Sequence, residues 1–200
     1  MNCATIDGNR AYTRHNQIRN LFNNALRGCT TRRRLEPTGI QGFDGRERPD
    51  LLFKYDHSVS NYEQKFTYLL DFSIAGAISQ QMTSKAKRQA ICTDHLVLAK
   101  ARVKQKAENV EGKHLHKDYK FRAICFESFG GFHEDAVKLI ETIGKTSQGN
   151  FRPELQTYQQ NTFTNYYVKA ISVALARYGA ENIINAVRVS CGAQYEFEFE

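Results

Sequence analysis

Tryptophan is absent from the 200 residues of this chain, and its aromatic bulk comes from 10 tyrosines and 13 phenylalanines. The sequence has no apolar run of roughly 18 residues, so it predicts no transmembrane helix. Residues 1–7 lack the charged and then apolar layout of a secretory signal peptide. We therefore expect an intracellular protein with no membrane partner, and the nucleus is one compartment that would suit it.

Closely spaced cysteines are also missing. The five cysteines, an odd number, lie far apart at Cys3, Cys29, Cys92, Cys125 and Cys191. Disulfide frameworks and zinc knuckles show even sets or short spacings, so this pattern argues against both. It predicts reduced thiols that are buried or half-buried.

Acidic residues are scarce at the start of the chain, where residues 1–35 hold seven arginines and a single acid, Asp7. A second basic stretch covers residues 100–120, and the whole chain carries a net charge of +7. Such clusters neutralise phosphates and release counterions, which favours a nucleic-acid partner. A basic face that meets only solvent is the alternative.

The composition, 41% hydrophobic and 24% charged, is that of a globular domain, and the periodicity predicts a mixed α/β sheet with helices on its faces. We expect helices over residues 12–27, 96–110, 134–143, 166–178 and 180–189, and strands over 30–35, 50–55, 66–74 and 121–126. A linker near Gly149 and Pro153 divides an α/β core over residues 1–146 from a helical C-terminal extension over residues 147–200. Residues 75–93 predict a loop with some helix, and residues 195–200 either an edge strand or a frayed tail.

Two aspartates stand out against their apolar surroundings. Asp50 follows Arg48-Pro49 at the start of one predicted strand, and Asp71 interrupts the apolar run of the next, 21 residues later. An unpaired charge in a buried strand is costly, so Asp71 implies a metal ion or a basic partner. If the two strands form a hairpin, both carboxylates meet at one edge of the sheet. Carboxylate oxygens are the ligands that Mg²⁺ and Mn²⁺ prefer, so we expect Asp50 and Asp71 to hold such an ion.

The order of these motifs resembles that of PD-(D/E)XK restriction-like endonuclease domains at the C-terminus of some non-LTR retrotransposon polyproteins. Those domains combine an Arg-His helix, an (R/K)PD strand, a strand ending in Asp-x-(Ser/Thr/Ala), a lysine-bearing helix and a final strand. The matching segments here are Arg14-His15-Asn16, Arg48-Pro49-Asp50, Asp71-Phe72-Ser73, residues 121–136 and residues 171–180. The resemblance implies a PD-(D/E)XK-like core, Mg²⁺ or Mn²⁺ as the cofactor, and DNA more than RNA as the partner.

One departure from the family pattern concerns the catalytic lysine, because Ser73 stands where the strand usually carries it. Family members with this departure draw the lysine from the helix that follows. The resemblance therefore implies Lys106, or alternatively Lys104, as the residue that supports negative charge on the phosphate. Glu36 and Glu127, each at the end of a strand, are further candidates to approach the site.

The sequence thus predicts a metal-dependent endonuclease-like domain in which Asp50, Asp71 and Lys106 or Lys104 carry the chemistry. The expected nucleic-acid-binding residues, which would grip the backbone without reading bases, are Arg14, His15, Arg32, Arg33 and Arg34. Two alternatives stay open. One is a catalytically inactive nucleic-acid-binding module of the same fold, and the other is a structural or assembly protein with a basic arm. The sequence does not define the oligomeric state.

Overall fold

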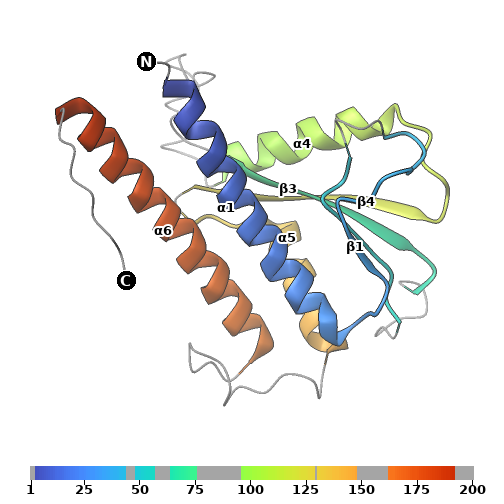
Figure 1. The fold of residues 1–200 in the computed structure, drawn as a ribbon. Helices are drawn as coiled ribbons and strands as arrows, with labels where there is room; N and C mark the ends of the chain where they lie inside the picture. The colour runs from blue at the N-terminus through green and yellow to red at the C-terminus, as the bar shows by residue number, and fades with distance from the viewer. Residues whose placement is uncertain are drawn as a thin grey trace.

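The computed structural model describes residues 3–43, 48–56, 64–75, 96–128, 130–147 and 162–191. It shows a four-stranded mixed sheet with four helices packed against it, which confirms the predicted α/β class (Figure 1). The strand order is β1-β2-β3-β4; β2 runs antiparallel to β1 and β3, and β4 runs parallel to β3. The antiparallel pairing of β2 with β3 is the hairpin arrangement expected for the two aspartate-bearing strands.

The elements follow the predicted order along the chain. They are α1 (Cys3–Ala25), the short 3-10 helix η1 (Leu26–Gly28), β1 (Arg33–Leu35), β2 (Leu51–Phe53), β3 (Thr67–Ala75), α4 (Val97–Glu111), β4 (Tyr119–Glu127), α5 (Glu134–Thr146) and α6 (Phe163–Cys191).

Alternation along the two long strands assigns each residue to one of two covered faces. Tyr68, Leu70 and Phe72 of β3 belong to the main core, together with residues of α1, α5 and α6. Ala123 and Cys125 of β4 lie on the other face, where Ala99 of α4 packs on them. Because side chains alternate along a strand, Asp71 and Ser73 must lie on the face that α4 covers. Helix α4 lies along this face of the sheet (Figure 1), and the alternation places Asp71 on the same face.

The C-terminal region differs in part from its prediction. Two helices were expected over residues 166–189, and the structure has one continuous helix, α6. Gly179 lies within this helix, and a Cβ at this position would be 3.5 Å from the Ser128 carbonyl oxygen, which is an ordinary van der Waals contact with the end of the sheet. Ile171, Ala174 and Leu175 belong to the same core cluster as α1 and the sheet.

Some predictions fall on residues outside the described ones: the loop over 76–93, the linker from residue 148 and the tail over 195–200. Among the described residues, no helix combines the length and the hydropathy needed to cross a bilayer.

Candidate active site at the start of strand β2

The site forms at the start of β2, where the neighbouring strand β3 continues past it. Leu51 pairs with Leu70, and the same register carried one step further brings Asp50 level with Asp71. The ladder changes here, because the Asp50 amide donates to the Leu70 carbonyl at 2.9 Å, one residue out of register. Departures of this kind, as in β-bulges, re-aim side chains next to active sites.

Asp50 is held by two donors from different elements. Nε2 of His15, on α1, lies 2.9 Å from Oδ1, and the Phe72 amide of β3 donates to Oδ2 at 2.6 Å. Burial raises the pKa of Asp50, but the hydrogen bond and charge of His15 and the Phe72 amide outweigh it, so the pKa lies below its usual value. The structure therefore favours the ionised form of Asp50.

The pKa of Asp71 is shifted in the opposite direction. Burial raises its pKa, the ammonium group of Lys106 lowers it, and the neighbouring Asp50 carboxylate raises it again, with a net upward shift. Lys106 forms an ion pair with Oδ1 of Asp71, and its own side chain is only 15% exposed. The basic partner that the sequence demanded for Asp71 is thus supplied by α4.

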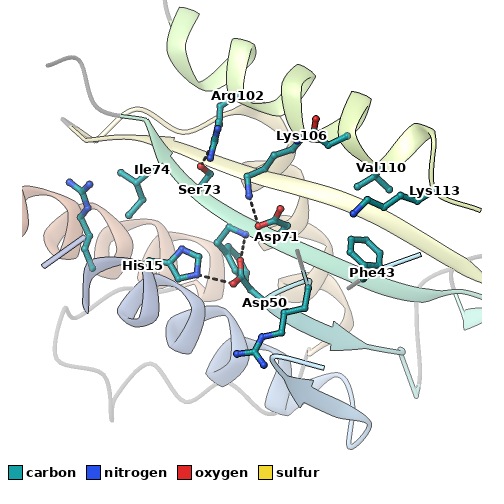
Figure 2. Close-up of a pocket in the computed structure, with 14 residues that line it drawn as sticks. His15, Phe43, Asp50, Asp71, Ser73, Ile74, Arg102, Lys106, Val110 and Lys113 are labelled. Atoms are coloured by element: carbon teal, nitrogen blue, oxygen red, sulfur yellow. Dashed lines mark hydrogen bonds and ion pairs between the residues drawn. The ribbon is translucent and has the colours of Figure 1, made fainter. Parts of the chain in front are cut away.

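The spacing of side chains along α4 matches the spacing of side chains along β3. Residues i and i+4 of a helix lie about 6 Å apart along its axis. Residues i and i+2 of a strand lie about 6.6 Å apart. Lys106 pairs with Asp71, and one turn earlier Nε of Arg102 donates to Oγ of Ser73 at 3.1 Å (Figure 2). Lys104, the alternative lysine, has a side chain 77% exposed and lies 3.9 Å from Glu108, away from the site.

A pocket of about 490 Å³ opens over the two aspartates. Five cationic side chains line it, against the two carboxylates: Arg14, Arg48, Arg102, Lys106 and Lys113. Nε of Arg14 is buried without a hydrogen-bond partner among the described residues, and burial lowers the pKa of this guanidinium. An unpaired buried donor is costly, and an anion in the pocket would satisfy it.

The expected nucleic-acid-binding residues divide into two groups. Arg14 and His15 line the pocket. Arg32, Arg33 and Arg34 do not, because Arg33 pairs across the sheet with Phe53, at the end of β2 opposite to Asp50. The structure therefore separates the arginine cluster of β1 from the aspartate pair.

Glu36 and Glu127 do not line the pocket, and each has a structural partner elsewhere in the fold or at the pocket rim. Glu36, at a left-handed φ of 45°, forms ion pairs with Arg19 of α1 and with Arg48. It thereby ties α1 to the segment that leads into Asp50. Glu127 accepts hydrogen bonds from the first amides of α4, at 3.3 Å from Leu98 and 3.4 Å from Ala99, and so caps that helix.

Three cationic pocket residues were not among the predicted site residues: Arg48, Arg102 and Lys113. Arg102 and Lys106 are four residues apart and lie on one side of α4, and Lys113 lies just beyond the end of that helix. The i, i+4 spacing could have revealed Arg102 once Lys106 was chosen. Arg48 belongs to the Arg-Pro-Asp motif itself.

No protein-family model, curated protein or solved structure matches this chain. The residues of the site must therefore be judged by their own chemistry. Within the described ranges, no three residues of the types His, Cys, Asp and Glu gather closely enough to hold a metal ion by themselves. Two adjacent carboxylates remain, in a pocket with an excess of positive charge.

Proposed function

We propose that this chain is a metal-dependent nuclease-like domain of the PD-(D/E)XK type, which binds DNA and hydrolyses phosphodiester bonds with Mg²⁺ or Mn²⁺. The observation that carries the proposal is the convergence of Asp50, Asp71 and Lys106 from three elements on one pocket. These three residues are far apart in the chain, and they are the ones that the sequence singled out for catalysis.

Two carboxylates are a fitting donor set for such an ion. Mg²⁺ is commonly bound through one or two carboxylates, and waters and substrate phosphate complete its shell. Asp50 and Asp71 would hold it, and when bound it polarises the phosphate and lowers the pKa of a water molecule. A site with more cations than carboxylates also suits a substrate that brings its own negative charge.

The remaining side chains act on position and charge. His15 and the Phe72 amide fix the orientation of the Asp50 carboxylate. The Lys106 ammonium lies where it would stabilise negative charge that develops on a phosphate at Asp71. Arg14 offers its unpaired Nε to a phosphate oxygen. None of these side chains needs to contact a nucleobase, so we expect little preference for DNA sequence.

A second candidate function is DNA binding without cleavage. It is favoured by the loss of the strand lysine at Ser73 and by the direct ion pair between Lys106 and Asp71, which satisfies both groups within the protein. The same pocket would then bind a phosphate backbone but would not activate water.

Plasmid nicking separates these functions. With Mn²⁺ or Mg²⁺, the wild-type chain should nick supercoiled DNA, and Asp71→Ala should lower the rate at least about 100-fold because a carboxylate of the metal site is removed. DNA affinity in EDTA should change little. Glu141→Gln, which neutralises an exposed acid of α5, is the matched control and should cleave like wild type.

Three other results would contradict this proposal or favour one of the alternative functions. Unchanged cleavage by Asp71→Ala contradicts the proposed mechanism. DNA binding by the wild type without metal-dependent nicking would establish the binding module. Large oligomers on size-exclusion chromatography, with no metal binding in calorimetry, would favour the assembly protein.

A further inference from the structure

Three cations form a row along the pocket beside α4. Arg102 and Lys106 of α4 line the pocket, and Lys113 lines it just beyond Glu111, where that helix ends. With a rise of 1.5 Å per residue, Arg102 lies about 6 Å from Lys106 along the helix axis. The row therefore extends to both sides of the aspartate pair, which Lys106 contacts directly.

Arg102 is oriented before any ligand binds. Its Nε donates to Oγ of Ser73 at 3.1 Å, and its Nη1 donates to Oε1 of Gln105 at 2.6 Å. Ser73 is only 8% exposed, so the acceptor is anchored in the sheet. Nη2 has no hydrogen-bond partner within the described part of the chain. A guanidinium fixed at two nitrogens loses little side-chain entropy when the third binds a ligand.

Arg102 also differs from Lys106 and Arg48 in its counter-charges. Lys106 is paired with Asp71 and Arg48 with Glu36, whereas Arg102 contacts only neutral oxygens among the described residues. Its positive charge on the pocket wall is therefore not compensated by a carboxylate. A phosphate oxygen is a ligand that an oriented guanidinium binds well.

We propose that Arg102 is a phosphate-binding residue of this site, and that Ser73 is the residue that positions it. It binds the phosphate next to the one at Asp50 and Asp71, so that the backbone of one nucleic-acid strand follows the row from Arg102 towards Lys113. This inference rests on the proposed function, since it names how the same pocket holds its substrate. It also gives Ser73, at the position of the missing strand lysine, a role in binding.

The alternative is that Arg102 only joins α4 to β3. A structural link and a phosphate contact differ in their dependence on salt. A side chain that neutralises a phosphate releases a counterion, so its loss lowers the slope of log K against log salt by about one. The loss of a purely structural contact does not change that slope.

The test measures binding of a fluorescent DNA duplex, and of one of its strands alone, by anisotropy in EDTA over a range of salt concentrations. Arg102→Ala should weaken binding about tenfold and lower the slope by about one, because one charge-assisted contact is lost. Ser73→Ala should weaken binding less and leave the slope unchanged, since the charge remains. Lys104→Ala is the matched control: it removes one positive charge from the exposed side of the same helix and should leave both quantities near wild type.

Thermal melting identifies variants that do not fold. Arg102→Gln keeps the aliphatic stem and a donor for Ser73 while it removes the charge, so it replaces Arg102→Ala if the alanine variant unfolds. It should show the same loss of slope. If folded Arg102→Gln or Arg102→Ala binds with the affinity and slope of Lys104→Ala, the inference is wrong. Loss of cleavage in Asp71→Ala alongside that result would leave the proposed function intact, whereas a wild-type chain that binds no DNA would overturn the proposed function itself.

Discussion

Asp50 and Asp71 share a side-chain type and a pocket, yet their surroundings shift their pKa values in opposite directions. His15 and the Phe72 amide lower the pKa of Asp50, and burial together with Asp50 itself keeps the pKa of Asp71 high despite Lys106. Neighbouring carboxyls whose pKa values are pushed apart titrate in two steps that belong to the pair. A metal ion would remove the repulsion that separates those steps.

The cysteines allow a prediction at the same scale. Cys29 and Cys125 are 4% and 0% exposed, and burial raises the pKa of each thiol to about 12. An unfolded thiol ionises at about pH 8.5. The stabilising contribution of the two buried thiols is therefore complete below about pH 8.5 and is lost as the pH rises towards 12.

Iodoacetamide labelling at pH 9 measures this protection. A variant with Cys3→Ser, Cys92→Ser and Cys191→Ser retains only the two buried thiols. We expect both to react far more slowly in the folded protein than in guanidinium chloride, because the thiolate is the nucleophile. Equal rates in the two conditions would show that the thiols are accessible.

At the scale of single elements, α4 depends on a cap from another part of the fold. Its first turn has no acidic residue, and Leu96 at its start has a left-handed φ of 62° and supplies no side-chain cap. Glu127, at the end of β4, provides both the acceptor and the negative charge that a helix N-terminus favours. The same helix carries Lys106 and Arg102 into the pocket.

Glu127→Ala should therefore lower the free energy of unfolding by about 1 kcal/mol, the usual effect of losing a helix cap. Urea denaturation followed by circular dichroism measures the change. Glu108→Ala, at a side chain of the same helix that is 58% exposed, is the control and should alter stability by less than about 0.5 kcal/mol. Equal stability of the two variants would mean that the Glu127 contact contributes nothing.

At the scale of the whole molecule, α6 completes the core on the face of the sheet opposite α4. Its residues Ile171 and Leu175 are 1% and 0% exposed and belong to one cluster with Phe22 of α1 and Phe72 of β3. Phe72 directly follows Asp71, and its amide holds Asp50. Strand β3 thus connects the packing of the C-terminal helix with the geometry of the site.

Leu175→Ala should lower the free energy of unfolding by about 2–5 kcal/mol, as expected for a cavity in a fully buried position. Val173→Ala, on the same helix with 47% exposure, should change it by less than about 0.5 kcal/mol. Chemical denaturation of both variants measures the difference. A Leu175→Ala variant as stable as wild type would show that residues 163–191 fold apart from the core.

Prediction from the sequence succeeded where a local pattern carries the information. Alternating and helical apolar spacing located the strands and helices that the structure describes, and the isolated charge of Asp71 in an apolar strand required a partner. The continuous course of α6 was missed, because Gly179 resembles a helix end in sequence, whereas its position beside Ser128 is a feature of the tertiary structure.

The sequence by itself determined the element order, the α/β class and the aspartates that stand out from apolar strands. Only the tertiary structure decided which charged residues surround these aspartates. Lys106 and Lys104 are equally basic in sequence, and the packing of α4 buries one against Asp71 and leaves the other in solvent. Likewise, Arg102 reaches the pocket and Arg32, Arg33 and Arg34 do not. Charge is a property of each residue, but the distance between charges follows from strand register and helix packing, which join segments far apart in the chain.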